Sequence, residues 1–250
     1  MSQKNLSASS KSLNLFNNKI VNRKILKIFD EFESSLNLDQ KFAVAISGGP
    51  DSLTLAYLSK IFSQKKKIKV KYFLVNHRLR EESTKEAQNV RLLLKKHKMK
   101  LEILTWKGNK PSSNVQSKAR EARYRLLFEK CKKLGVKNIL LGHHLDDLLE
   151  NFLIRMLRGS GLRGLVSFDK KSKYNNDINI YRPLINLEKK DLIYVAEKVF
   201  KSYISDSSNF DKKFKRTKVR KLLFDLEKEG LDKKKFFSTI QNLKSSDNAI

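Results

Sequence analysis

The stretch KFAVAISGGPDS, residues 41–52, decides the fold of this chain. Its first half is a short apolar run that favours a β-strand, and its second half is a turn rich in Gly, Ser and Asp. The pattern LTLAYLSKIF, residues 53–62, then predicts a helix. A strand that ends in a glycine turn and leads directly into a helix is typical of an α/β domain that binds its ligand at the strand ends.

The turn SGGPDS at residues 47–52 has the composition of a phosphate-binding loop. Glycines let backbone N–H groups approach an anion closely, and the positive end of the following helix dipole adds to the attraction. The turn contains no lysine, so it is neither a GxxxxGK[ST] loop nor a GxGxxG loop. An ordinary strand-to-helix turn is the alternative, but the position after the first strand favours phosphate binding. We therefore expect nucleotide contacts from all of its residues: Ser47, Gly48, Gly49, Pro50, Asp51 and Ser52.

Apolar runs and helical patterns alternate along the chain up to about residue 205. Such alternation predicts a parallel sheet whose strands are joined by right-handed crossovers. We expect an α/β fold with about five strands and with helices on both faces, of the Rossmann-like kind. The further strands are predicted at 68–75, 101–106, 138–142 and, as a short extended piece, 180–185, and the further helices at 20–36, 84–97, 113–134, 145–158 and 187–200.

The second half of the chain also contains segments without the pattern of a buried element. Residues 158–164 predict a glycine-rich turn, and the polar residues 169–179 predict a surface loop. Near the C-terminus we expect two helices on either side of Gly230. We therefore divide the chain into a catalytic α/β domain, residues 1–205, and a small basic helical extension, residues 206–250.

The charge of the chain points to a polyanionic partner. The 250 residues include 54 Lys and Arg against 26 Asp and Glu, which gives a formal net charge of +28. A field of this size attracts nucleic acid and steers its approach. The alternative is a lysine-rich solvated surface that follows from an A/T-rich genome.

Composition excludes several other classes of protein. Apolar residues make up 40% of the chain, enough to bury a core. No apolar run reaches the ~18–20 residues that a membrane span needs, and the N-terminus lacks the apolar segment of a secretory signal. The single cysteine, Cys131, excludes a disulfide framework and a cysteine-built zinc site. We expect a soluble cytoplasmic protein that does not bind membranes.

The glycine turn resembles the pyrophosphate-binding loop of the N-type ATP pyrophosphatases, enzymes of the adenine nucleotide alpha hydrolase type that cleave ATP between its α and β phosphates. Further motifs follow in order, and together they resemble the tRNA(Ile)-lysidine synthetase family over most of residues 41–224. They are VNHRLREES (75–83), NVQSKAREARYRLL (114–127), LGHHLDDLLENFLIRMLRGSGLRGL (141–165), RPL (182–184), SDSSNFD (205–211) and FKRTKVRKLL (214–223). Each motif alone is weak evidence for this family, whereas the occurrence of all of them in the same order is specific to it.

The resemblance implies a tRNA-modifying ligase that uses ATP and Mg²⁺. In the first step, the wobble cytidine of an isoleucine tRNA with the anticodon CAU is adenylated at its 2-oxo group, and pyrophosphate leaves. In the second step, the amine of free lysine attacks that carbon and displaces AMP. The other functions that stay open are a tRNA thiolation enzyme on the same scaffold and a non-catalytic RNA-binding module that responds to ATP. The oligomeric state, monomer or homodimer, stays open too.

The resemblance also assigns catalytic roles near the predicted strand ends. Asp51 and Asp147 would hold Mg²⁺, with positioning of the nucleophile as a second role for Asp147, and Glu150 would bind the incoming lysine. Asp147 and Glu150 are three residues apart and so share one helix face. Arg120 and Arg123 would stabilise the charge that develops on the leaving groups. The alternatives are an acidic first helical turn that balances the helix dipole, and arginines that are merely solvated or ion-paired.

The remaining assignments concern the rim of the nucleotide pocket and the RNA. By the same resemblance, His77, Arg80 and His144 would contact the nucleotide. Residues 212–221 carry seven cations and no anion, and we expect them to contact the tRNA backbone. A solvated helix face is the alternative for this segment.

Two positions depart from the family pattern. Asn76 stands where members usually have Asp, and Asn151 stands where they usually have Thr after the glutamate. Asparagine donates and accepts hydrogen bonds but supplies no charge, which puts any metal or ammonium role of position 76 in doubt. The chain also ends at residue 250, whereas many relatives carry further C-terminal domains, so it is either a minimal form or part of a longer protein.

Overall fold

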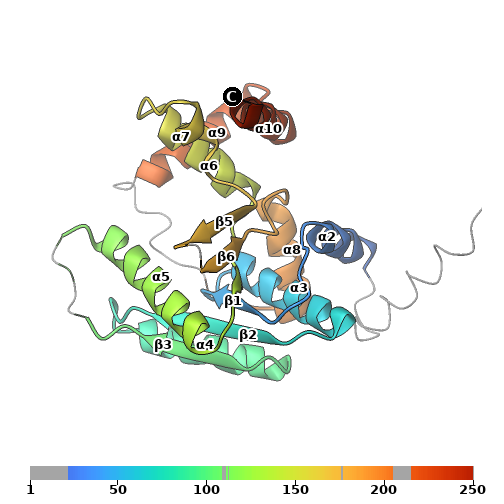
Figure 1. The fold of residues 1–250 in the computed structure, drawn as a ribbon, viewed down its shortest axis with the longest axis vertical. Coiled ribbons are helices and arrows are strands. Elements are labelled where there is room, and N and C mark those ends of the chain that lie inside the picture. The colour runs from blue at the N-terminus through green and yellow to red at the C-terminus, as the bar shows by residue number, and fades with distance from the viewer. Residues whose placement is uncertain (1–21, 109–110, 112, 176, 205–214, 250) are drawn as a thin grey trace, which may run out of the picture.

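The computed structural model describes residues 22–108, 111, 113–175, 177–204 and 215–249. Within these residues, six strands form one sheet in the order β3-β2-β1-β4-β6-β5, and helices pack against both of its faces (Figure 1). Five of the strands are parallel, and β5 runs antiparallel to β6 at one edge. The predicted α/β class and the parallel sheet are confirmed.

The elements predicted before residue 158 are all present, and α3 is longer at both ends than predicted. The strands are Phe42–Ile46 (β1), Val70–Asn76 (β2), Leu101–Thr105 (β3), Asn138–Leu140 (β4), Lys171–Tyr174 (β5) and Ile178–Tyr181 (β6). The helices are Arg23–Ser34 (α2), Pro50–Lys66 (α3), Ser83–Lys96 (α4), Val115–Lys133 (α5), Leu145–Met156 (α6), Leu162–Val166 (α7), Lys189–Phe200 (α8), Lys215–Lys228 (α9) and Lys233–Ala249 (α10).

Two local predictions were wrong. The segment 169–179, predicted as a surface loop, contains β5 and the start of β6, and the turn at 158–164 continues into α7. β5 has the sequence KSKY and is mostly exposed, because an edge strand is held by its backbone bonds to one neighbour and needs no apolar pattern. The helix predicted at 113–134 begins at Val115, after a cap residue, Asn114, in the left-handed conformation.

The two faces of the sheet are covered by different helices. Successive side chains of a strand point to opposite faces, so Phe42, Val44 and Ile46 of β1 join a large apolar cluster with α2, α3, α4 and α8. Ala43 points the other way, into a smaller cluster with α5. Because both faces are covered, the loops at the carboxyl ends of the parallel strands form the edge that is suited to a ligand.

The C-terminal helices belong to a third apolar cluster. Val219 and Leu223 of α9 and Ile240 of α10 pack with Leu149 and Phe152 of α6. Both helices are thereby fixed to a helix that starts at the ligand edge of the sheet. The predicted domain boundary falls outside the described residues, so the division into two domains stays a prediction. None of the helices in the described part of the chain has the length and apolar character that a membrane crossing requires.

Candidate active site

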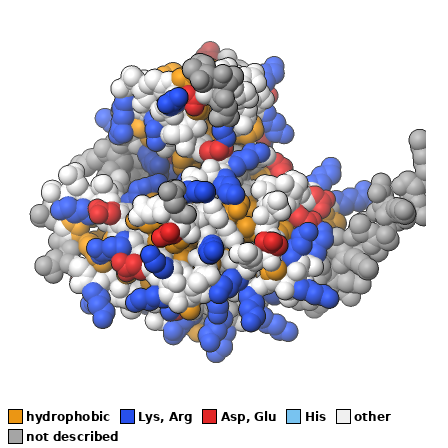
Figure 2. All heavy atoms as spheres, in the orientation of Figure 1, with side chains coloured by type: hydrophobic (Ala, Val, Ile, Leu, Met, Phe, Trp, Pro, Cys, Tyr) orange, Lys and Arg blue, Asp and Glu red, His pale blue; other side chains and the backbone are white. Residues whose placement is uncertain are grey.

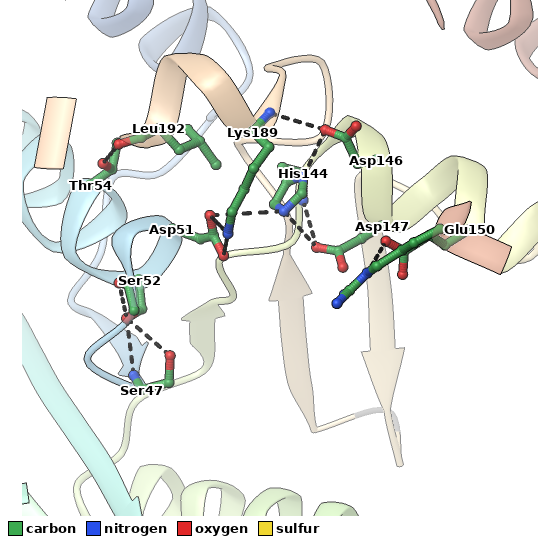
Figure 3. Close-up of polar contacts among 12 residues, drawn as sticks. Ser47, Asp51, Ser52, Thr54, His144, Asp146, Asp147, Glu150, Lys189 and Leu192 are labelled. Atoms are coloured by element: carbon green, nitrogen blue, oxygen red, sulfur yellow. Dashed lines mark hydrogen bonds and ion pairs between the residues drawn. The ribbon is translucent and has the colours of Figure 1, made fainter. Parts of the chain in front are cut away.

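The loop between β1 and α3 is held in shape by its own glycine and serine residues. Gly48 has a φ of +93°, which residues with a side chain rarely adopt, and a Cβ there would lie 2.7 Å from Val90 Cγ2. The Ser52 hydroxyl accepts hydrogen bonds from the N–H groups of Ser47 and Gly48, both at 3.1 Å (Figure 3). The same hydroxyl donates to Gly49 O at 3.0 Å. These internal bonds give the loop its shape before any ligand binds.

The start of α3 offers the anion site of this loop. Gly49 is the N-cap, and Pro50 occupies the first helical position, where its missing N–H is not needed. The N–H groups of a first helical turn have no acceptor within the helix and carry the positive end of its dipole. Because Ser52 already occupies the N–H groups of Ser47 and Gly48, the amides available to a phosphate are those at the start of the helix, including that of Asp51.

A cavity of about 1050 Å³ opens at the carboxyl ends of β1, β2 and β4. Its size suits a nucleotide, since small-molecule sites commonly have ~300–1000 Å³. Five of the predicted site residues are not among those that line it: Gly48, Gly49, Pro50, His144 and Glu150. The cavity brings together eight of the predicted site residues: Ser47, Asp51, Ser52, His77, Arg80, Arg120, Arg123 and Asp147.

Two arginines of α5 line the cavity and are oriented by aromatic neighbours. The Arg120 guanidinium lies 5.0 Å from the ring centre of Tyr124, and Arg123 Nε lies 3.5 Å from His77 Nε2. Burial, and then the charge of Arg123, lower the pKa of His77 to about 4. The His77 imidazole is therefore neutral at pH 7 and can accept this hydrogen bond. Neutral aromatic partners orient a guanidinium group without removing its charge.

His144 is buried among three carboxylates at the start of α6 (Figure 3). Its Nε2 lies 3.8 Å from Asp51 Oδ1 and 3.5 Å from Asp147 Oδ2, and its Nδ1 lies 3.3 Å from Asp146 Oδ2. Burial acts to lower the pKa of His144, but Asp147 and the other two carboxylates outweigh it, so the pKa is raised. Burial acts to raise the pKa of Asp147, but the charge interactions with His144 and His143 outweigh it, so this pKa is lowered. His144 therefore joins the loop to α6 electrostatically.

Three acids at this edge are paired with cations from distant elements. The pairs are Lys189 Nζ at 2.6 Å from both oxygens of Asp51, Lys233 Nζ at 2.7 Å from Asp146 Oδ1, and Arg220 Nε at 2.6 Å from Glu150 Oε1. The cations come from α8, α10 and α9. Sequence reasoning missed these partnerships because 70 to 138 residues separate the two members of each pair. No local pattern in the sequence indicates them.

Glu150 differs from the other acids because it is buried beneath α9, with 3% of its surface exposed. Burial raises its pKa more than Arg220 lowers it, so the pKa lies above its usual range. Oε1 is bonded to Arg220, whereas Oε2 has no hydrogen-bond partner among the described residues. The role of Glu150 in lysine binding stays a prediction, and it requires the ammonium to reach this buried oxygen.

Comparison with known proteins gives the family. The sequence model of the PP-loop domain matches residues 17–227. The chain belongs to the PP-loop family. Membership supports ATP as the nucleotide of the cavity.

The PP-loop chain is also similar to curated tRNA(Ile)-lysidine synthases. It is 41% identical over 183 residues to that of Orientia tsutsugamushi, covering 73% of this chain and 41% of the relative. It is 43% identical over 192 residues to that of Wolbachia pipientis, covering 76% and 44%. It is 36% identical over 191 residues to that of Rhodopseudomonas palustris, and the match covers 76% of this chain and 55% of the relative. The chain thus spans about half of the length of the curated relatives that it matches, or less.

A solved structure confirms the architecture of this PP-loop chain. The U34-tRNA thiolase NcsA from Methanococcus maripaludis, solved with its [4Fe-4S] cluster, superposes with a TM-score of 0.74. The match covers 91% of this chain and 80% of the thiolase, at 19% identity. At this identity the likeness shows the fold alone.

Asn76, the first of the two departures from the family pattern, supports the loop that follows β2. Asn76 is buried, its Nδ2 donates to Thr84 Oγ1 at 3.1 Å, and its Oδ1 accepts from Arg78 N at 3.0 Å. The amide therefore shapes the cavity rim without adding charge. Nearby on the rim, Arg80 pairs with Glu86 at 3.0 Å.

The other departure, Asn151, has a contact within its own helix. Asn151 Oδ1 accepts a hydrogen bond from Arg155 Nε at 2.7 Å, and Arg155 also donates to Gly164 O at 2.9 Å. The pair links α6 to α7. Asn151 is not among the residues that line the cavity.

The described residues contain no group of three or more His, Cys, Asp and Glu side chains that could hold a metal ion. The arrangement therefore does not fit an all-protein metal cage. Asp51 and Asp147 nevertheless share a small volume, since each has an oxygen within 4 Å of His144 Nε2. Mg²⁺ is commonly held by one or two carboxylates and completes its shell with phosphate oxygens and water. Two neighbouring acids beside the helix N–H groups that begin α3 fit that mode.

Proposed function

We propose that this chain is the nucleotide-binding, catalytic part of a tRNA(Ile)-lysidine-forming ligase that uses ATP and free lysine. The observation that carries the proposal is the cavity at the carboxyl edge of the sheet. It combines residues of the glycine loop at 47–52, the acid Asp147, and Arg120 and Arg123 of α5, which together form the arginine wall of the cavity. The names of the curated relatives supply the substrate class. Cytoplasm is the compartment where tRNA, ATP and free lysine are available together.

The first proposed step is transfer of adenylate. The 2-oxo oxygen of the wobble cytidine attacks the α-phosphorus of ATP, the bond to the bridging oxygen breaks, and pyrophosphate leaves with the electron pair. Negative charge grows on the leaving group, so Arg120 and Arg123, which line the same cavity, stabilise the transition state. The N–H groups at the start of α3 hold the phosphates in line with the attack.

The second proposed step forms the carbon–nitrogen bond. The neutral amine of lysine attacks C2 of the activated cytidine, and the bond to the AMP oxygen breaks. Lysine arrives as an ammonium, which Asp147 can hold because it lines the cavity with a lowered pKa and is ionised. The ammonium releases one proton to solvent before the attack. Glu150 stands one helical turn further along α6 and is the second carboxylate that we assign to the lysine.

We assign Mg²⁺ to Asp51 and Asp147. When bound, the ion would neutralise phosphate charge and polarise the bond that breaks. The support is the shared position of the two acids near His144 Nε2, at 3.8 and 3.5 Å. Asp51 must exchange its present partner Lys189 for the ion, because both of its oxygens lie 2.6 Å from Nζ.

We assign the tRNA backbone to the cationic segment 212–221. The part of this segment that the structure describes includes Arg216, which lines the cavity, and Lys218 and Lys221 on α9. A backbone held here lies beside the nucleotide cavity, so the anticodon loop can enter it. Binding through phosphate contacts weakens steeply with salt, with a slope of about 0.9 per contact in a plot of log K against log salt for duplexes.

The thiolation alternative finds little support in this chain. Its one cysteine, Cys131, lies in the apolar cluster beneath α5. Burial raises the pKa of the thiol to about 12, so it stays protonated at pH 7 and is a poor nucleophile or cluster ligand. The binding-only alternative does not explain why acids and arginines line one cavity.

The test is mass analysis of the nucleosides from a CAU-anticodon tRNA(Ile) transcript after incubation with the chain, ATP, Mg²⁺ and isotope-labelled lysine. We expect a labelled lysidine nucleoside that requires all three substrates. Sulfur incorporation in a matched reaction with a sulfur donor would favour thiolation. The absence of any product together with intact RNA binding would favour a binding module.

A further inference from the structure

Lys189, the first residue of α8, is held at both its backbone and its side chain. Its N–H donates to Asp146 Oδ2 at 3.0 Å, and its Nζ lies 2.6 Å from both Asp51 oxygens (Figure 3). The helix that carries it is docked on α3 by a buried bond from Thr54 Oγ1 to Leu192 O at 2.8 Å. The position of this ammonium relative to the loop is therefore set by two packed helices.

The ammonium stands where a phosphate ligand can reach it. Lys189 itself is not among the residues that line the cavity, but its partner Asp51 lines it at the N-terminus of α3, and 40% of the Lys189 side chain is exposed. The glycine loop itself has no lysine, in contrast to GxxxxGK[ST] loops, in which the loop supplies a lysine to the phosphates. The fold brings a lysine to the same helix end from 138 residues further along the chain.

We propose that Lys189 is the phosphate-binding lysine of this site and contacts the β and γ phosphates of the bound nucleotide. The inference rests on the proposed nucleotide site but not on the identity of the RNA or the amino acid. Without nucleotide, the ammonium neutralises Asp51. With nucleotide and Mg²⁺, it moves by a rotation of its flexible side chain to the phosphate oxygens and leaves Asp51 to the ion. No proton is transferred in this exchange, since the lysine stays an ammonium.

The exchange also serves the chemistry of the first step. As the bond between the α-phosphorus and the bridging oxygen breaks, charge accumulates on the pyrophosphate. An ammonium already on that group stabilises the charge more strongly in the transition state than in the bound substrate. Arg120 and Arg123 approach from α5, whereas Lys189 approaches from α8.

The matched control is Lys190, the next residue of the same helix. Its side chain is 71% exposed and pairs with Glu188 at 2.7 Å, whereas Lys189 pairs with Asp51 of the cavity wall. Lys189→Met and Lys190→Met therefore remove the same charge from adjacent positions. Lys189→Arg keeps the charge with a different reach.

The experiment measures equilibrium binding of two probes, α,β-methylene ATP and AMP, to the full chain with Mg²⁺ present. Removal of one charge-assisted hydrogen bond weakens binding by about tenfold to a hundredfold. We expect Lys189→Met to weaken binding of the ATP analogue by that factor while AMP changes by less than about twofold, because AMP lacks the two phosphates concerned. Lys189→Arg should recover part of the affinity, and Lys190→Met should match the wild type.

Two results would overturn the proposal. An unchanged affinity of Lys189→Met for the analogue would show that the lysine does not bind the phosphates. Equal decreases in affinity for the analogue and for AMP would show that it only holds the shape of the site. Failure of the wild-type chain to bind the analogue at all is a different result, and it would remove the proposed nucleotide site itself.

Discussion

The two edges of the sheet carry positive charge in different forms. At the carboxyl edge, Lys189, Lys233 and Arg220 are each paired with an acid beside the cavity. At the opposite, amino edge, exposed lysines gather where α3 and α4 end and the next strands begin. They are Lys66, Lys67, Lys69, Lys71, Lys95, Lys96, Lys98 and Lys100.

The lysines of the amino edge are explained by helix ends and solvent. Cations are favourable near the C-terminus of a helix, and Lys67 and Lys98 both have a φ of 56°, the left-handed conformation that commonly follows one. Lys and Arg side chains are spread over the whole visible face rather than gathered in one patch (Figure 2). The net charge of +28 therefore does not locate the site. The site is located instead by the ion pairs between cations of distant helices and the acids beside the cavity.

The largest expected effect is the loss of the acids on the cavity wall. Asp51→Ala and Asp147→Ala each remove a group that we place at the phosphates, so adenylate formation should fall by about 10²–10³-fold or more. The measurement is tRNA-dependent pyrophosphate release from ATP. Cooperative thermal unfolding and unchanged tRNA binding serve as controls. Variants that keep wild-type turnover would show that the carboxyl edge is not the active site.

The next effect concerns the arginine wall. Arg120→Met or Arg123→Met should lower the rate of pyrophosphate release by about 100-fold, because each removes a donor aimed at developing charge. Arg125→Met is the matched control, since Arg125 is exposed on the same helix and does not line the cavity. If all three variants show the same decrease in activity, that decrease reflects the general charge of α5 rather than the site.

A smaller effect, on stability, follows from the ion pair of Glu150 and Arg220. Arg220→Met leaves Glu150 buried without its cation and should lower the free energy of unfolding at pH 7 by about 2 kcal/mol, discounted because Arg220 is 41% exposed. Lys221→Met, on the exposed side of α9, should change it little. Urea unfolding of both variants gives the values.

The pH dependence of that destabilisation has a definite sign. The pKa of Glu150 in the folded chain already lies above its usual value of 4.5, and removal of Arg220 raises it further. A raised carboxyl pKa favours the folded state below the unfolded value, and this advantage is lost as the pH rises through the folded pKa. The penalty of Arg220→Met should therefore be small near about pH 4 and grow toward pH 7. A penalty that is constant with pH would contradict a charge-based pair.

The smallest expected effect is at the amino edge. Lys67→Gly relieves a left-handed lysine at the end of α3 and should raise stability by up to about 1 kcal/mol. Catalysis and tRNA affinity should stay at wild-type values. A marked fall in tRNA affinity would show that this edge, too, binds RNA, and the contrast between the edges would then disappear.

The sequence was sufficient for the elements whose pattern is local. β1, the glycine turn and α3 were found together because an apolar run, a glycine pair and a helical pattern follow one another within residues 42–66. The same reasoning missed β5, whose residues KSKY lie at an exposed edge and are held by backbone bonds to β6.

For the site, the sequence named the cavity residues but not their partners. Asp51, Asp147 and the two arginines of α5 were found because they belong to motifs. Lys189 and Lys233 stand in lysine-rich helix starts that look like many others in this chain, and only the fold brings them to Asp51 and Asp146. An ion pair between two distant helices produces no periodic pattern in the sequence, so it could not be predicted from the sequence.

The most direct test of the proposed site is a crystal structure of the chain with α,β-methylene ATP and Mg²⁺. We predict the β and γ phosphates at the N–H groups that begin α3, the α-phosphorus facing Asp147, and Arg120 and Arg123 on the opposite wall. A triphosphate bound away from residues 47–52, or a loop whose helix N–H groups do not bind phosphate, would contradict the proposed site.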